Sequence, residues 1–212
     1  LSRRAITQAT RFGVEFLSPK SVESIELKDG YKLLTLNDNN TIKTRAVVIT
    51  TGVDYRKLDK KGIHDFTGAG VYYGAATTEA AACKNQNVFI IGGGNSAGQA
   101  AMYLSQFAKK VFILIRKPEL TSSMSSYLID QINSVENIEV KGNTEIEEAK
   151  GTDRLEEVTL INNNSGEKET YEAGALFIFI GARPYTDWID ISVLRDDKGF
   201  LLTGRDILQR KD

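Results

Sequence analysis

The chain has 212 residues, of which 41% are hydrophobic and 26% charged, and this composition excludes a disordered or fibrous protein. Its 27 basic residues nearly balance its 28 acidic ones, so no basic surface that neutralises nucleic-acid phosphates is expected. The apolar runs are far shorter than the roughly 20 residues that span a bilayer. We therefore expect neither nucleic acid nor a membrane among its partners.

The first part of the chain changes from a helical to a strand periodicity near Gly13. Apolar residues at helical spacing predict a helix over 1–12, with Gly13 at the C-cap. A period of two follows and predicts strands, two of them joined as a hairpin. These elements are a short strand at 14–16, hairpin strands at 22–27 and 31–36 with an Asp29-Gly30 turn, and a buried strand at 46–50.

The second part of the chain repeats this order. The elements are a helix at 124–132, strands at 138–140, 145–149 and 155–161, a turn at 162–164 and an apolar strand at 176–180. Residues 47–52 and 177–181 each form an apolar strand closed by a glycine, so we infer a duplicated fold. Because only the second copy is preceded by a strand, a glycine-rich turn, a helix and a further strand (88–115), we expect the chain to be a fragment of a longer protein.

A glycine-rich turn joins a predicted strand at 88–91 to a predicted helix at 96–107. The turn, Gly92-Gly93-Gly94-Asn95-Ser96-Ala97, fits the G-x-G-x-x-A pattern of dinucleotide-binding proteins. Gly92 permits the tight bend, Gly94 lets the backbone approach a diphosphate, and Ala97 allows close packing of the helix. A second strand at 111–115 disfavours a merely tight turn, so the pattern predicts a Rossmann unit whose helix N-terminus binds phosphates.

The residues after strand 111–115 bear on the choice between NADH and NADPH. Arg116 and Lys117 stand where a carboxylate would accept a hydrogen bond from the ribose 2′-hydroxyl of NADH, and cations there favour the 2′-phosphate of NADPH. Glu119 is close enough to repel a phosphate or to pair with either cation. A solvated cationic turn is the alternative, and NADPH is the prediction.

Together with Thr51-Gly52 and residues 179–186, the glycine turn resembles the low-molecular-weight thioredoxin reductases. These are FAD- and NAD(P)-dependent pyridine nucleotide-disulfide oxidoreductases, and the resemblance covers the whole chain. It implies an α/β fold in which a Rossmann-like NAD(P)-binding domain is inserted in an incomplete FAD-binding domain. The implied parts are a partial FAD-binding domain at 1–66, the NAD(P)H-binding domain at 67–188, and the start of the return to the FAD domain at 189–212.

The same resemblance implies further site residues. Thr51 and Gly52 would lie near the crossover between the domains, and Ile180, Gly181 and Ala182 would approach the nicotinamide side. It also implies a homodimer in the intact protein. This chain alone is expected to bind FAD poorly, because the two FAD motifs of the family lie outside it. We assign no catalytic acid, base or nucleophile and predict no metal site.

The chain departs from thioredoxin reductases at their redox-active Cys-x-x-Cys, where Gly74 and Thr77 occupy the two cysteine positions. Cys83 is the single cysteine, which favours a reducing, cytoplasmic location, and it is expected to be a half-buried packing residue. Without a dithiol there is no route for thiol–disulfide exchange. The chain therefore looks like the branch that lacks the cysteine pair, and Tyr72-Tyr73 nearby is expected mainly to pack, with a ring near the flavin as the alternative.

The predicted function is the NADPH-binding part of a flavoprotein oxidoreductase that transfers hydride from NADPH to FAD, with an unknown small-molecule or redox-protein acceptor. One alternative is a ferredoxin or flavodoxin reductase, which needs no dithiol. Another is a non-catalytic NADPH-binding redox sensor. Reduction of the flavin followed by its reoxidation would distinguish the enzymes from the sensor.

Overall fold

A computed structural model describes residues 2–74 and 79–209 of the chain. The chain divides into two compact units, one made of Leu1–Asp54 with Arg183–Asp212 and the other of Tyr55–Ala182. Two short strands, β4 (Val53–Tyr55) and β13 (Ala182–Pro184), pair where the chain passes from one unit to the other. No helix among the described residues is long and apolar enough to cross a membrane.

The smaller unit contains a helix and a three-stranded antiparallel sheet. Helix α1 (Ser2–Arg11) confirms the predicted N-terminal helix, and β1 (Val22–Lys28) pairs with β2 (Tyr31–Leu36) as the predicted hairpin. Asp29 and Gly30 both have positive φ, 50° and 76°, as a two-residue hairpin turn with the right-handed strand twist requires. The third strand, β3 (Thr41–Thr44), was not predicted, and a short helix, α4 (Arg205–Gln209), ends the described chain.

Two predicted strands of this unit, 14–16 and 46–50, are wrong. Both segments lack strand pairing, and Val48 is 86% exposed although it was predicted to be buried. A strand needs a neighbour that receives its backbone hydrogen bonds, and the sheet of β1, β2 and β3 contains no further strand in the part of the chain that the structure describes. The period of two at 14–16 and 46–50 therefore indicates side chains that suit a strand, but it does not show whether a neighbouring strand is present to pair with them.

The larger unit is built on a five-stranded parallel sheet. Its strands follow the order β5-β12-β6-β7-β8, and every neighbouring pair is parallel. They are β5 (Val71–Tyr73), β6 (Asn87–Ile91), β7 (Lys110–Leu114), β8 (Ile138–Lys141) and β12 (Ala175–Ile178). Helix α2 (Asn95–Leu104) connects β6 to β7, and α3 (Ser126–Asn133) connects β7 to β8. The strand–turn–helix–strand prediction is thus confirmed, whereas β5 was missed because it is only three residues long.

A second, antiparallel sheet lies in the connection from β8 to β12. It has the order β11-β10-β9 and consists of β9 (Thr144–Gly151), β10 (Leu155–Asn162) and β11 (Lys168–Glu172). The first two strands were predicted and the third was not. Single-turn helices η1 (Ala80–Cys83) and η2 (Leu120–Ser122) complete the unit.

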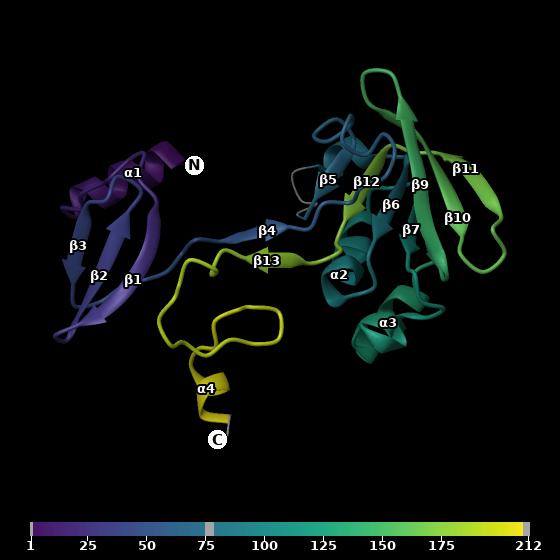
Figure 1. Cartoon of the computed structure of the whole chain (residues 1–212). Coiled ribbons are helices and arrows are strands. Elements are labelled where there is room, and N and C mark those ends of the chain that lie inside the picture. Colours follow the sequence, from purple (N-terminus) through teal and green to yellow (C-terminus); the bar gives the residue numbers. More distant parts are fainter. Residues whose placement is uncertain (1, 75–78, 210–212) are drawn as a thin grey trace. The chain divides into compact units, whose positions relative to one another are not determined.

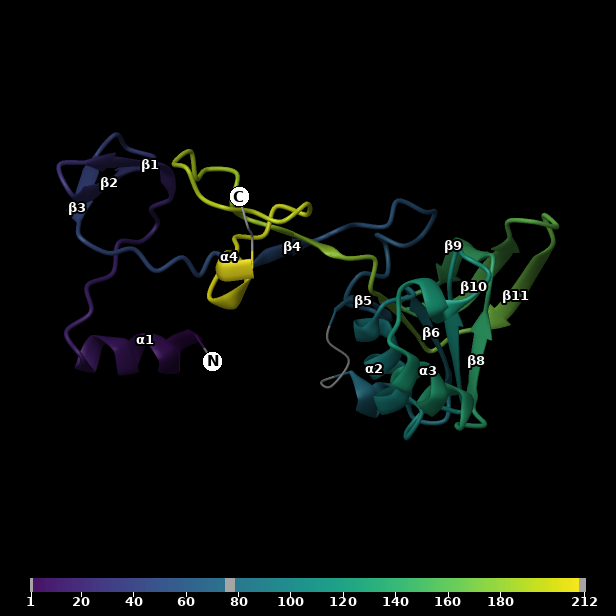
Figure 2. The same cartoon turned by 90° about the horizontal axis from the view of Figure 1, so that it is seen from below.

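The parallel sheet separates two cores. Val88 and Ile90 of β6 pack on the side of α2 and α3, whereas Phe89 packs on the side of β9–β11. Successive side chains of a strand point to opposite faces, so one strand contributes to both cores. Figures 1 and 2 show the helices and the antiparallel sheet on opposite faces. Tyr72 and Tyr73 pack against these cores, which confirms their predicted packing role.

The segment that enters the larger unit belongs to its core. Ile63 is fully buried and Phe66 is 8% exposed, and both pack among side chains of β9 and β10. The structural boundary accordingly lies between Asp54 and Tyr55, whereas the sequence analysis divides the chain after residue 66. The return boundary lies between Ala182 and Arg183, against residue 188 in the sequence analysis.

Glu139 of β8 gives the larger unit an expected pH dependence. Its carboxylate contacts Lys110 Nζ of β7 at 2.5 Å and Lys141 Nζ at 3.4 Å, and the hydrogen bond from Lys110 is the main cause that lowers the pKa of Glu139 below its usual 4.5. A lowered folded-state pKa stabilises the fold above the unfolded-state pKa, and this contribution disappears as the pH falls through the folded-state value. We expect Glu139→Gln to be less stable than the parent at about pH 7, with the gap closing as the pH falls through the lowered pKa of Glu139. Urea unfolding at about pH 7 and at a series of acidic pH values measures this, and a gap that stays constant with pH would contradict it.

Candidate dinucleotide-binding site

The parallel sheet reverses its winding direction beside β6. From β6 the chain winds through α2 to β7 and through α3 to β8, whereas β12 returns to the opposite side of β6. Open α/β sheets bind ligands beyond the carboxyl ends of their strands at such a switch point, because the connections on the two sides diverge there. The glycine turn follows β6 directly and therefore lies at this point.

Gly92 and Gly94 have different structural requirements. Gly92 has φ +138°, and a Cβ there would lie 2.4 Å from the backbone oxygen of Phe179, so only glycine fits. A Cβ on Gly94 would find nothing nearer than Ser123 O at 4.0 Å. The space beside Gly94 is therefore open to a ligand.

Helix α2 begins at this open space with unpaired donors. Gly94 is its N-cap and provides no side chain, and the N–H groups of Gly94, Asn95 and Ser96 have no acceptor among the described residues. Such N–H groups at a helix N-terminus favour an anion, and the helix dipole adds to the effect. Ala97 is fully buried against the sheet, as the motif predicts.

Side chains from the next connection hold the glycine turn. Ser123 Oγ donates to Gly93 O at 2.7 Å, and Asn95 Oδ1 accepts hydrogen bonds from Ser125 N at 2.9 Å and Ser125 Oγ at 3.1 Å. The side chain of Asn95 therefore bonds to the N-cap residue of α3, and only its backbone N–H points to a role with phosphate.

We expect Asn95→Ala to lower the free energy of unfolding by about 1 kcal/mol, because Ser125 N–H and Oγ–H lose their common acceptor. Asn95→Asp is the matched control, since its carboxylate keeps an acceptor oxygen. Chemical denaturation of the three proteins measures the difference. Equal losses in both variants would show that the hydrogen bonds to Ser125 do not stabilise the turn.

A cavity of about 470 Å³ opens beside the glycine turn within the larger unit. Its volume lies in the range of small-ligand sites. Apolar side chains from the ends of β6, β7 and β9 form part of its wall, among them Ile91, Ile115 and Ile146. Gly92, Gly93, Gly94, Arg116, Lys117 and Ile180, all predicted site residues, line it together.

Positive charge dominates the ionisable groups of this cavity. Five cations line it against two carboxylates, Glu119 and Glu145. The cations are Arg56, Lys57, Lys60, Arg116 and Lys117. None of them forms an ion pair with a residue that the structure describes, so their charges are available to a ligand.

Three of these cations, at 56–60, were not predicted from the sequence. They follow β4 and precede the whole Rossmann unit in sequence, so no motif connected them with the glycine turn. The density of basic residues in Arg56-Lys57-Leu58-Asp59-Lys60-Lys61 is the signal that could have drawn attention to them.

The remaining predicted residues lie elsewhere. Gly181 O accepts a hydrogen bond from Arg56 N at 3.1 Å, and neither Gly181 nor Ala182 lines the cavity. Asn95, Ser96 and Ala97 form the first turn of α2, directly after the lining residue Gly94, and are not themselves among the lining residues. Thr51 and Gly52 belong to the smaller unit, where Thr51 Oγ1 donates to Tyr185 O at 3.0 Å.

The position matched to the first cysteine of the redox-active pair is occupied by glycine in a left-handed conformation. Gly74 has φ +84°, and a Cβ there would lie 2.9 Å from Cζ and from the hydroxyl oxygen of Tyr55. Thr77, matched to the second cysteine, lies outside the described residues.

Cys83 is a packing residue. It is fully buried, and its Sγ donates to Glu79 O at 3.4 Å. Burial raises the pKa of its thiol to about 11, and the nearby charge of Glu79 adds to the shift. A thiol that stays protonated and inaccessible does not take part in disulfide exchange. The structure thus corrects the expected half-burial, because the side chain is enclosed completely.

The switch-point turn, the open helix N-terminus and the parallel sheet with its crossover helices define a Rossmann-type dinucleotide-binding fold. The family described as pyridine nucleotide-disulphide oxidoreductase matches residues 2–207. The chain belongs to this family.

Its relatives include thioredoxin reductases. That of Streptomyces clavuligerus is 32% identical over 194 residues, covering 92% of this chain and 59% of the relative. That of Peptoclostridium acidaminophilum is 32% identical over 209 residues, covering 96% of this chain and 65% of the relative. The chain thus spans roughly three fifths of the curated relatives that it matches.

Solved structures agree with this relationship. A thioredoxin reductase from Giardia duodenalis superposes with a TM-score of 0.80 at 28% identity, covering 93% of this chain and 63% of that one. The thioredoxin reductase of Streptococcus pyogenes gives a TM-score of 0.78 at 28% identity, covering 95% of this chain and 65% of that one.

Proposed function

We propose that the chain is the NADPH-binding part of a flavoprotein oxidoreductase that transfers hydride from NADPH to FAD. The observation that carries the proposal is that the glycine turn, its N-cap residue Gly94 at the start of α2, and cations with no ion-pair partner among the described residues meet in one cavity. An acidic cavity would repel a ligand with so many phosphate oxygens, and an uncharged cavity would not attract it.

NADPH fits the groups that are present. The N–H groups at the start of α2 and the open side of Gly94 suit the diphosphate, and Arg116 with Lys117 beyond β7 suits the 2′-phosphate. Ile91, Ile115 and Ile146 offer an apolar wall. When bound, the nicotinamide supplies the hydride and the flavin accepts it. The residues of the chain bind and orient the nucleotide and shield it from water.

For the smaller unit we propose part of the FAD-binding domain, with Thr51 and Gly52 near the crossover, and a homodimer for the intact protein. In this proposal the flavin passes its electrons to the final acceptor without a dithiol of this chain. The chain has a single cysteine, Cys83, and its side chain is fully buried. The unpaired thiol also supports a cytoplasmic location.

The test is the visible spectrum of the flavin-containing protein without oxygen, before and after NADPH and, separately, NADH. Bleaching of the flavin band at a lower concentration of NADPH than of NADH is expected. A flavin that neither nucleotide reduces would overturn the reductase and favour an NADPH sensor, provided that NADPH still binds. Reoxidation by ferredoxin or flavodoxin would identify that class of acceptor.

A further inference from the structure

We propose that Arg56 and Lys57 form a second phosphate-binding wall, which recognises the diphosphate common to NADPH and NADH and leaves discrimination between the two to Arg116 and Lys117. This rests on the proposed function, since it concerns the same cavity. It assigns binding roles to residues that no dinucleotide motif contains.

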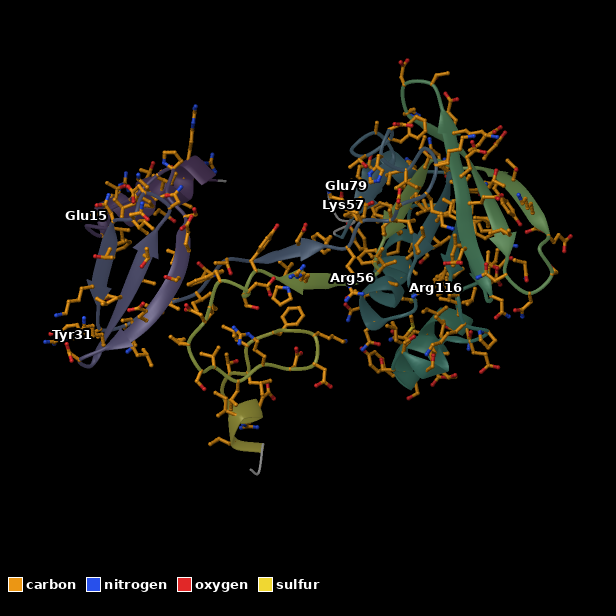
Figure 3. The ribbon with its side chains drawn as sticks, in the orientation of Figure 1. Glu15, Tyr31, Arg56, Lys57, Glu79 and Arg116 are labelled. Atoms are coloured by element: carbon orange, nitrogen blue, oxygen red, sulfur yellow. The ribbon has the colours of Figure 1, made fainter. Side chains whose placement is uncertain are left out.

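The two groups of cations stand on opposite sides of the glycine turn. Arg116 and Lys117 follow β7, which is the neighbour of β6 on one side. The segment with Arg56 and Lys57 is tied to the other side: Arg56 N donates to Gly181 O beyond β12, and Leu58 N donates to Tyr73 Oη of β5 at 3.1 Å. Figure 3 labels Arg56, Lys57 and Arg116.

A dinucleotide lies across a switch point with its diphosphate at the glycine turn. The adenosine ribose then faces the strand after the crossover helix, which is β7 here, and the nicotinamide faces the opposite side. The 2′-phosphate is on the adenosine ribose, so Arg116 and Lys117 are placed to distinguish NADPH from NADH. Cations on the β12 side are placed to reach the diphosphate, which both nucleotides carry.

The backbone of the segment 56–61 is fixed by the fold, and this favours a binding role over a solvated one. In addition to the hydrogen bonds of Arg56 and Leu58, Ala149 N donates to Lys61 O at 2.9 Å. Lys61 itself forms an ion pair with Glu148 at 2.5 Å and does not line the cavity. Within one short segment, therefore, one lysine is paired with a carboxylate, and Arg56 and Lys57 face the cavity with no ion-pair partner among the described residues.

Calorimetric titration of the whole chain with NADPH and with NADH tests the proposal. Arg56→Gln combined with Lys57→Gln is expected to weaken both nucleotides by about tenfold or more, with their affinity ratio unchanged, because charge-assisted contacts to a shared group are lost. Arg116→Gln is expected to weaken NADPH by about tenfold and NADH little. Lys61→Gln is the matched control and should leave both affinities unchanged.

Each other outcome overturns the proposal in a distinguishable way. If the double variant, folded as judged by its thermal midpoint, keeps both affinities, the wall does not exist although the proposed function stands. If it weakens NADPH alone, Arg56 and Lys57 recognise the 2′-phosphate. If the unaltered chain binds neither nucleotide, the proposed function fails as well.

Discussion

Gly92→Ala is expected to lower the free energy of unfolding by about 1–3 kcal/mol and to weaken NADPH binding by about tenfold or more. At φ +138° an L-residue is strained, and the added Cβ would lie 2.4 Å from Phe179 O, which is backbone that follows β12. Because a backbone atom cannot rotate away, the turn itself has to shift. The N–H groups of Gly94, Asn95 and Ser96 would then leave their places beside the cavity.

Gly94→Ala separates the effect on binding from the effect on folding. Its Cβ would enter open space, with Ser123 O at 4.0 Å as the nearest atom, so the free energy of unfolding is expected to stay within about 0.5 kcal/mol. NADPH should nevertheless bind more weakly, since the methyl group occupies the place where the diphosphate approaches. Chemical denaturation and calorimetry measure both quantities. Normal binding by Gly94→Ala would show that the diphosphate does not lie there.

Phe89→Ala is expected to destabilise the larger unit by about 3–5 kcal/mol. Phe89 is fully buried in the middle of β6, stacks on Phe112 at a centroid distance of 4.8 Å and contacts Tyr171 at 5.8 Å. Its loss leaves a cavity between the parallel sheet and β9–β11, because neighbouring strands are held by their hydrogen bonds and cannot close it.

Tyr127→Ala is the control for Phe89→Ala. Tyr127 lies on α3 of the same unit and is 57% exposed, so its removal should cost less than about 1 kcal/mol. Urea unfolding followed by circular dichroism gives both values. Similar losses in the two variants would mean that the interior between the sheets is not closely packed.

The Rossmann core could be predicted because its signals are local. The strand before Gly92, the turn and the helix after it follow one another along the chain, and so does the strand before Arg116. Each is marked by the residues that form it. The same holds for the hairpin at Asp29-Gly30, whose turn residues determine how the two strands meet.

What the sequence analysis missed depends on contacts between distant segments. The apolar residues 46–50 suit a strand as well as 88–91 do, but only the second run has neighbours on both sides, β12 and β7. The segment that carries Arg56 and Lys57 is held beside the site by hydrogen bonds from Arg56 N to Gly181 and from Leu58 N to Tyr73, which no spacing along the chain reveals. The sequence therefore predicts which residues suit a strand or a phosphate site, but not which distant segments contact one another in the fold.

The left-handed backbone at Gly74 restricts the residues that this position accepts. A cysteine at 74 would have to adopt φ +84°, a conformation that strains L-residues, and the Tyr55 side chain would have to move aside, because the added Cβ would lie 2.9 Å from its Cζ and Oη. A cysteine pair at 74 and 77 would therefore require a change of backbone as well as two substitutions. A single substitution to cysteine at 74 would be penalised before a second cysteine could make it useful, so one-step sequence change favours a chain without the pair.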